Sequence, residues 1–344
     1  MKKKIIGLIL LILIVIGGFA GWKLFGPSIA TPSGEFFYVK TGSTKDEVRA
    51  ELINKKYISN GTWFDLASKM LKYKTVKPGR YKITKGMSLI TLVRMLRNGS
   101  QSQVNLVITK LRTKEDLARK TGNLFEFDSL QMISFLNNTD SLKVYGLDTN
   151  TVTAVVMPFT YTINWNSTPE KVFEQFYTAY KKFWTDERKV KADSLHLTPL
   201  QVSALASIVE EETNKKADKY NIASTYLNRI RTGMKLQADP TVKFAMKNFA
   251  LKRVLGIHLK TDSPFNTYMY AGIPPGPICT PSVESIEAVL DAPKTDYLYF
   301  VASSKFDGTS VFAADYEEHQ KNAKLYQDEL TRRMDSVKKL NANK

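Results

Sequence analysis

Three consecutive acids, Glu210, Glu211 and Glu212, end an apolar segment in the second half of this 344-residue chain. A carboxyl group held against an apolar helix face has a raised pKa, because burial disfavours its charged form. Such a group can serve as a general acid near neutral pH. The segment therefore favours acid catalysis on an acetal or an ester as the chemistry of this protein.

The acids are predicted to lie on a helix that begins at Pro199. Thr198 can cap this helix, proline suits its first position, and Gln201 stands three residues after the cap. Apolar residues then recur at steps of three and four and define the buried stripe of the helix: Val202, Leu205, Ile208 and Val209. We therefore expect one face of this helix to lie in the core.

The helical repeat predicts a different direction for each of the three acid side chains. Glu212 stands three residues after Val209 and four after Ile208, so it continues the apolar face inward. Glu210 lies at the edge of the stripe, and Glu211 points away from it as a solvated acid. Because an acid in line with the core is costly unless it is neutral or hydrogen-bonded, Glu212 is the predicted catalytic residue. Glu210 is a candidate substrate ligand or a second solvated acid.

Polar residues downstream are candidate ligands for a sugar. Gln237 and Asp239 stand in a polar turn, where an amide and a carboxylate can bind hydroxyl groups, although Asp239 could instead cap the following helix. Asn228 lies on a second predicted helix, from Thr225 to Arg231, and is a candidate for the same role. Its neighbour Arg229 fits a substrate carboxylate or a solvated face equally well.

Asn266 and Tyr268 precede a loop that prolines stiffen, from Gly272 to Ile278. Aromatic rings stack on the apolar faces of sugars, and a stiff loop holds such rings in place without an ordering cost. Tyr268 is therefore a predicted substrate ligand. The alternative for Tyr268 is a half-buried tyrosine of the core.

The order of these segments resembles the YceG-like family of endolytic murein (lytic) transglycosylases. The resemblance rests on ASIVEEE, NRI and LQADPTV, followed by Asn-Thr-Tyr at 266–268 and Gly-Ile-Pro-Pro-Gly-Pro-Ile at 272–278. It implies that the family's catalytic glutamate corresponds to Glu212, and that Asn266 and Tyr268 border the cleft as substrate ligands. One segment departs from the family, which carries Pro-Asp-Thr-Tyr where this chain has Phe159 in place of the acid.

The resemblance implies a lyase that cleaves nascent peptidoglycan glycan strands between N-acetylmuramic acid and N-acetylglucosamine. One glutamate would act first as acid and then as base, leave 1,6-anhydro ends and need no cofactor or metal. Two alternatives stay open. One is a peptidoglycan hydrolase with Asp239 as its second carboxylate. The other is a non-catalytic, wall-binding scaffold in which the acids are structural.

The N-terminus predicts a membrane anchor. Lys2, Lys3 and Lys4 precede an apolar run from Ile5 to Trp22, which is about long enough to span a bilayer. The positive charges place the N-terminus in the cytoplasm and the catalytic part on the periplasmic or extracytoplasmic side of the cell (inner) membrane, crossed once. A cleaved signal peptide is the alternative, but Gly18-Phe19-Ala20 matches a cleavage site poorly.

The net charge and the composition limit the classes of partner that the protein can bind. A net charge of +17 suits anionic lipids, anionic wall polymers or nucleic acid, and the orientation of the anchor disfavours nucleic acid. The single cysteine, Cys279, and three scattered histidines disfavour a metal site. We expect peptidoglycan glycan strands, the membrane and the wall-synthesis machinery as partners.

The predicted fold is α+β, with four parts. Residues 1–26 form the transmembrane anchor, and a turn-rich linker follows it. Residues 35–108 repeat a strand, a turn and an amphipathic helix, which is similar to LysM-type carbohydrate-binding modules and fits any small α+β domain as well. Residues 109–195 form a linking region of helices and a strand, and residues 196–344 form a larger, mixed α/β catalytic domain of the YceG-like type.

Overall fold

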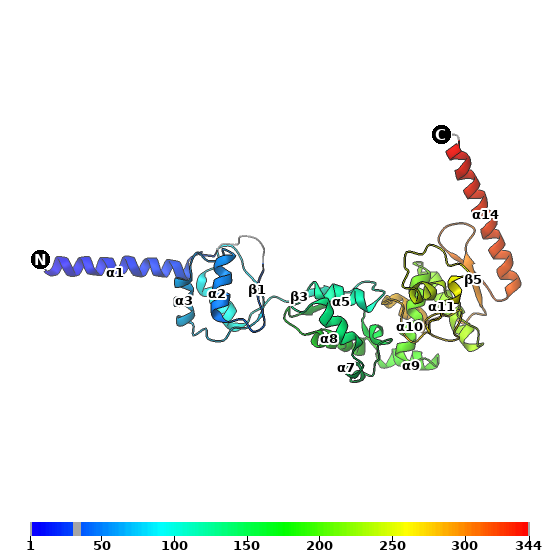
Figure 1. Cartoon of the computed structure of the whole chain (residues 1–344), viewed down its shortest axis with the longest axis horizontal. Coiled ribbons are helices and arrows are strands. Elements are labelled where there is room, and N and C mark those ends of the chain that lie inside the picture. Colours follow the sequence, from blue (N-terminus) through cyan, green and yellow to red (C-terminus); the bar gives the residue numbers. More distant parts are fainter. Residues whose placement is uncertain (1, 30–35, 343–344) are drawn as a thin grey trace. The chain divides into compact units, whose positions relative to one another are not determined.

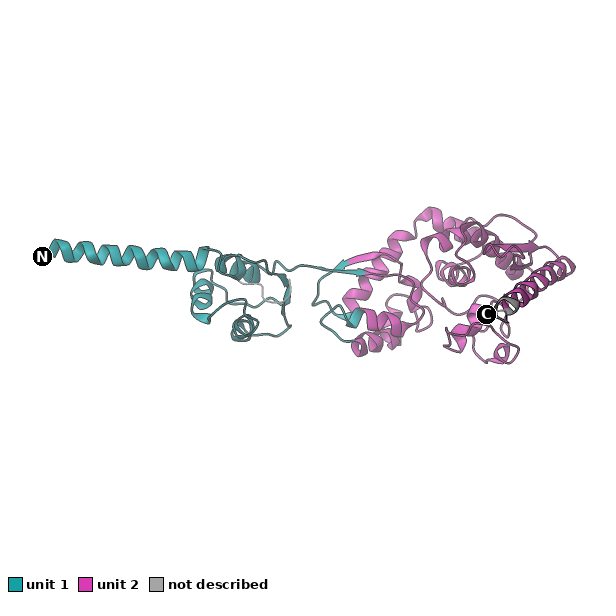
Figure 2. Cartoon of the chain, turned by 90° about the horizontal axis from the view of Figure 1, so that it is seen from above, with its two compact units in different colours: residues 1–106, 121–128, 162–169 teal, residues 107–120, 129–161, 170–344 magenta. Residues whose placement is uncertain are grey.

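A computed structural model describes residues 2–29 and 36–342 of the chain, with side chains described to residue 337. The predicted start of the module at residue 35 lies outside these residues. The chain divides into two compact units (Figure 2). The first comprises residues 1–106, 121–128 and 162–169, and the second comprises the remainder. Helices and short strands occur in both, so the mixed helix and sheet class is confirmed.

The first helix, α1 (Lys2–Phe25), carries the apolar N-terminal run (Figure 1). By length and composition it is the one helix among the described residues that is long and apolar enough to cross a membrane. The first residues of the predicted turn-rich linker are held against the first unit. Ile29 is 3% exposed, its N–H donates to the Met87 carbonyl, and its own carbonyl accepts from Gly86.

The rest of the first unit is built on one antiparallel pair of strands and three helices. Strand β1 (Phe36–Val39) pairs with β2 (Gly79–Lys82), with Phe36 opposite Lys82. Between and after them come α2 (Lys45–Asn54), α3 (Gly61–Met70) and α4 (Leu89–Asn98). The predicted strands and the first and last of these helices are confirmed, whereas α3 was not predicted.

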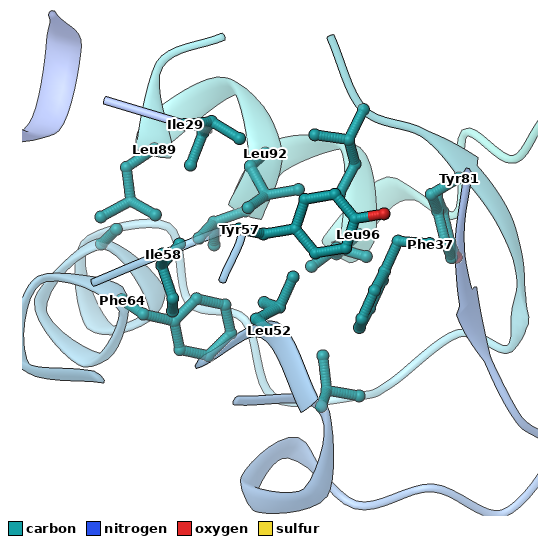
Figure 3. Close-up of a cluster of buried hydrophobic side chains, with 14 of the residues drawn as sticks. Ile29, Phe37, Leu52, Tyr57, Ile58, Phe64, Tyr81, Leu89, Leu92 and Leu96 are labelled. Atoms are coloured by element: carbon teal, nitrogen blue, oxygen red, sulfur yellow. The ribbon is translucent and has the colours of Figure 1, made fainter. Parts of the chain in front are cut away.

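Apolar residues from every element of this unit meet in one core, which Figure 3 shows in close-up. Phe37 comes from β1, Leu52 from α2, Phe64 from α3 and Leu92 from α4, and none of these side chains is exposed. Side-chain caps fix where the helices begin, because Thr44 forms a capping box at α2 and Ser88 accepts a backbone N–H at α4. These caps therefore set where α2 and α4 begin around the shared core.

Short helices and one further pair of strands occupy the middle of the chain. Strand β3 (Val104–Val107) pairs with β4 (Thr160–Ile163). The helices here are α5 (Lys114–Gly122), α6 (Ser129–Asn137), α7 (Thr139–Lys143), the 3-10 turn η1 (Val152–Val155), α8 (Pro169–Phe183) and α9 (Asp186–Ser194).

The second unit contains the helix that bears the three acids, α10 (Pro199–Glu212). Its N-terminus has the predicted capping box, in which Thr198 accepts from the Gln201 N–H and the Gln201 side chain accepts from Thr198. Helices α11 (Lys216–Arg231), α12 (Asp239–Ala245) and α13 (Val283–Leu290) pack around it, as does η1. Every residue from 202 to 209 is consequently buried, rather than a single stripe.

The remaining elements are the 3-10 turn η2 (His258–Lys260), an antiparallel pair formed by β5 (Tyr299–Ala302) and β6 (Ser310–Ala313), and α14 (Tyr316–Ala342). The predicted start of the second helix was too late, because α11 begins at Lys216 rather than Thr225. Helix α14 begins at Tyr316, where the Asp315 carboxylate accepts the Glu318 N–H and so caps the helix.

Because the capping box positions the start of α10, Thr198→Ala is expected to lower the free energy of unfolding by about 1 kcal/mol. Urea unfolding followed by circular dichroism measures this loss. Thr198→Ser keeps the accepting oxygen and serves as the control, with stability near that of the wild type. Equal losses in both variants would contradict a capping role for the hydroxyl.

Candidate active site

A cavity of about 470 Å³ opens at the C-terminal end of α10, where the last residue of that helix is Glu212. Residues from α11, from the turn before α12, from the segment around Tyr268, from β5 and β6, and from α14 line it with Glu212. Of the predicted site residues, the structure brings four into this cavity: Glu212, Gln237, Asp239 and Tyr268.

Glu212 is held by a neutral partner. Its Oε1 accepts a hydrogen bond of 2.7 Å from the hydroxyl of Tyr226, a buried residue of α11. Burial raises the pKa of the Glu212 carboxyl to about 7, and the nearby Asp239 carboxylate adds to the increase. The Tyr226 hydrogen bond and the more distant Lys243 and Arg229 act in the opposite direction without cancelling it. Glu212 can therefore carry a proton near neutral pH and release it.

Arg229 is a cation that lines the same cavity as Glu212, but its guanidinium donates its hydrogen bonds to backbone carbonyls. The guanidinium donates to the carbonyl of Leu298 at 2.7 Å and to that of Leu236 at 2.6 Å. It also lies 5.5 Å from the centre of the Tyr299 ring. Arg229 is 7% exposed, so the solvated alternative is wrong. The side chain fastens α11 to β5 and to the turn that bears Gln237.

The turn before α12 places a second carboxylate in the cavity. Asp239 is the first residue of α12, and its carboxylate accepts a hydrogen bond of 2.7 Å from the Tyr268 hydroxyl. No side chain caps α12, so the alternative of Asp239 as the cap is not what the structure shows. Gln237 stands beside it in the left-handed region, with φ 51°. Burial and the Asp239 carboxylate raise the pKa of Tyr268, which therefore stays a hydrogen-bond donor.

Two predicted ligands, Asn228 and Asn266, do not line this cavity, and their side-chain amides donate hydrogen bonds to backbone carbonyls elsewhere. The Asn228 amide donates to the carbonyls of Thr295 and Tyr297, and it borders a separate cavity of about 670 Å³ on the other face of α11. Asn266 is fully buried and donates to the carbonyls of Leu259 and Thr261. Both amides hold loops in place in this arrangement.

Glu210 also lies apart from the cavity. Its Oε2 pairs with the Lys219 ammonium at 3.0 Å and accepts hydrogen bonds from the hydroxyls of Ser282 and Ser285 at the start of α13. Burial alone would raise the pKa of Glu210, but these hydrogen bonds and the Lys219 charge outweigh it and keep the pKa low. Glu210 thus joins α10 to α11 and α13 as a carboxylate.

Glu211 is not the solvated acid that the helical repeat predicts. Its side chain is 15% exposed, and its two oxygens accept hydrogen bonds of 3.1 and 3.0 Å from the Arg112 guanidinium, with Lys110 at 3.0 Å. Burial would raise the pKa of Glu211, but the two cations hold it below its usual range. The helical repeat could not reveal these partners, because they stand about a hundred residues earlier in the chain.

Sequence reasoning missed the aromatic wall of the cavity. His319 of α14 stacks on Tyr299 of β5, with ring centres 5.2 Å apart. Burial and the charge of Arg229 lower the pKa of His319, so the ring is neutral. Its buried Nδ1 has no hydrogen-bond partner among the described residues. The sequence offers no local signal for these groups, because the hairpin and α14 bring them to Glu212 only in three dimensions.

The sequence profile of the YceG-like family matches residues 37–325. The chain belongs to this family. A protein of Bacillus subtilis (strain 168) named endolytic murein transglycosylase is 30% identical over 310 residues, which cover 84% of this chain and 83% of the relative. A protein with the same name from Streptococcus pneumoniae (strain D39) is 27% identical over 356 residues; the match covers 92% of this chain and 63% of the pneumococcal protein.

A solved structure is also similar. The crystal structure of a yceG-like protein from Listeria monocytogenes superposes with a TM-score of 0.57 at 26% identity. The match covers 84% of this chain and 99% of the other. The YceG-like fold therefore extends over most of the residues described above.

The raised pKa makes the stability of the protein depend on pH. The folded state keeps the Glu212 proton up to about pH 7, whereas the ordinary value is 4.5. Wild-type stability should therefore fall as the pH rises from about 4.5 to 7 and stay lower above that, while Glu212→Gln lacks this titration. At about 1.4 kcal/mol per pKa unit, the variant should gain roughly 1 to 3 kcal/mol over the wild type between pH 5 and pH 8.

Urea unfolding at pH 5 and pH 8 checks this gain. Glu211→Gln is the control, because the pKa of Glu211 is lowered and the acid is already charged at both pH values. Its difference from the wild type should be similar at the two pH values. A pH-independent difference for Glu212→Gln would show that this carboxyl titrates normally.

Proposed function

We propose that this protein is a membrane-anchored, endolytic lytic transglycosylase that cleaves peptidoglycan glycan strands. The observation that carries the proposal is the Glu212 carboxyl, whose pKa burial raises to about 7, in a cavity that Gln237, Asp239 and Tyr268 also line. Relatives named endolytic murein transglycosylase support the substrate class and the reaction. The expected products are strands with 1,6-anhydro-N-acetylmuramic acid ends.

One carboxyl group performs both proton transfers in this reaction. Glu212 gives its proton to the oxygen between N-acetylmuramic acid and N-acetylglucosamine as the bond from C1 to that oxygen breaks. The Glu212 carboxylate then takes the proton of the muramic C6 hydroxyl, whose oxygen bonds to C1. The proton returns to the glutamate and no water is consumed. The Tyr226 hydroxyl holds the carboxylate in place during both steps.

Asp239 has a supporting role in this scheme. Its negative charge raises the pKa of Glu212 and would stabilise positive charge that develops at C1. Its hydrogen bond to Tyr268 favours this role over that of a base, since one oxygen is already occupied. A hydrolase would use Asp239 to activate water, as glycosidases with two carboxylates do. A wall-binding scaffold has no use for a protonated Glu212.

The N-terminal part would hold the enzyme at its substrate. In the proposal, α1 crosses the membrane once, with Lys2 to Lys4 in the cytoplasm and the catalytic part outside. The order strand, helix, helix, strand from β1 to β2 supports a LysM-like, glycan-binding module in the first unit. Nascent strands and the wall-synthesis machinery are the partners expected at this location.

The three acids should differ sharply when each is changed to glutamine. Glu212→Gln keeps size and hydrogen bonding but cannot exchange the proton, so the turnover number should fall by roughly a hundredfold or more. Glu211→Gln should keep turnover near the wild-type value. Glu210→Gln should be intermediate, because Lys219 then loses one of its two carboxylate partners, Glu210 and Glu284.

Digestion of purified glycan strands, with 1,6-anhydro ends counted by mass spectrometry, ranks the three variants. Thermal melting of each variant separates loss of fold from loss of chemistry. An inactive Glu210→Gln beside an active Glu212→Gln would move the catalytic role to Glu210. Full activity in all three would sink the enzyme proposal for this segment.

Asp239→Asn separates the transglycosylase from the hydrolase. The amide still accepts a hydrogen bond from Tyr268 but carries no charge and is a poor base. We expect a partial loss of turnover, with products that still end in 1,6-anhydro rings and weigh one water less than hydrolysis products. Wild-type products that carry the mass of water, together with an inactive Asp239→Asn, would identify the hydrolase instead. Tyr268→Phe, which removes only the partner hydroxyl, is the matched control.

A further inference from the structure

Helix α3 has an apolar face that the core of its own unit covers only at Trp63, which is half-buried and packs against that core. Phe64, Ala67 and Ser68 point into the core. Trp63, Leu66 and Met70 stand three and four residues apart on a neighbouring face, where Leu66 is 41% and Met70 53% exposed. We call these three residues the α3 face.

The α3 face continues the surface of α1. The ring of Trp63 meets that of Phe19 edge to face, with centres 6.0 Å apart. Phe19 belongs to the apolar run of α1 and lies less than two helical turns from the end of that helix at Phe25. Figure 1 shows α3 beside this end of α1. In a membrane spanned by α1, Trp63 would therefore lie at the depth of the lipid–water interface.

The end of α1 has the composition of an interface. Trp22 is exposed there, and the Lys23 ammonium lies 5.3 Å from the centre of its ring. Tryptophan and lysine are the residues that membrane helices place at the headgroups. A small cavity of about 190 Å³ separates Trp22 and Lys23 from Trp63, so the three residues border a single recess.

Positive charge surrounds the α3 face. Residues 36–106 contain fourteen Lys and Arg against four Asp and Glu, a net charge of +10 out of +17 for the whole chain. Exposed lysines follow the face directly, at Lys69 on α3 and at Lys72 and Lys74 after it. Polyanions of the wall would match these charges but would leave the apolar side chains unused. Anionic phospholipid matches both, with headgroups for the lysines and acyl chains for the face.

We propose that α3 lies in the surface of an anionic phospholipid bilayer, with the α3 face in the lipid and Lys69, Lys72 and Lys74 at the headgroups. This inference rests on the proposed anchor and adds a second, lateral contact between the first unit and the membrane. The unit is then held against the bilayer by two elements rather than tethered by one.

Site-directed spin labels on the full chain in lipid nanodiscs test the contact. Labels at Leu66→Cys and Met70→Cys report the α3 face, and Lys40→Cys at the end of β1 is the water-exposed control. Ile12→Cys in α1 tests the anchor separately. Cys279 is buried with a raised thiol pKa and should not take the label. Collisions with oxygen report lipid, and collisions with a water-soluble nickel chelate report solvent.

In nanodiscs that contain phosphatidylglycerol, labels at 66 and 70 should resemble the label at 12, with low nickel and high oxygen accessibility. Lys69→Glu with Lys72→Glu, or nanodiscs of phosphatidylcholine alone, should raise nickel accessibility at 66 and 70 and leave position 12 unchanged. Nickel accessibility at 66 and 70 equal to that at 40, with 12 still protected, would overturn the proposal while leaving the anchor intact. Protection at 66 and 70 only after wall polymer is added would overturn it in favour of a glycan contact. Exposure at position 12 would show instead that the anchor itself fails.

Discussion

The hydrogen bond between Tyr226 and Glu212 is the interaction on which the candidate site depends. It satisfies a carboxyl group at the end of a buried helix without introducing a cation, so burial can keep the proton on the acid. An arginine or lysine in the same place would stabilise the carboxylate and lower its pKa. Arg229 lines the same cavity, but its guanidinium donates to two backbone carbonyls.

The three consecutive acids show that partners, rather than burial alone, determine the protonation of a carboxyl group. Glu210 and Glu211 are almost as enclosed as core residues, at 13% and 15% side-chain exposure, yet both are anions because lysine or arginine faces them. They brace α10 against its neighbours, while Glu212 faces a tyrosine. A single helix end thus supplies two structural ion pairs and one titratable acid within three residues.

Local sequence was sufficient to predict much of the helix that carries the candidate site. The capping box at Thr198 and the end of α10 at the acids follow from residue spacing within one helix, and the structure agrees with both. The inward direction predicted for Glu212 agrees with its hydrogen bond to the buried Tyr226 and its place in the lining of the cavity. The pairing of Glu211 with Arg112, and the two backbone partners of Asn266, depend on chain segments that only folding brings together. The same holds for His319 and Tyr299, which meet Glu212 through the β5–β6 hairpin and α14. Helix periodicity also could not show that α3 covers the core on one side and leaves an apolar face on another.

The burial and hydrogen bonding of Ile29 in the first unit limit how that unit can move relative to α1. Leu24 and Ile29 are both buried, and two backbone hydrogen bonds fasten the chain at Ile29, so α1 and the small unit turn together. Anchoring α1 would then confine the unit to a plane and also set its orientation, leaving rotation about the membrane normal as its main freedom. The unit would then bind a ligand on the same membrane surface at a raised effective concentration. Because the orientation of the unit is already fixed, this binding would cost little further orientational entropy.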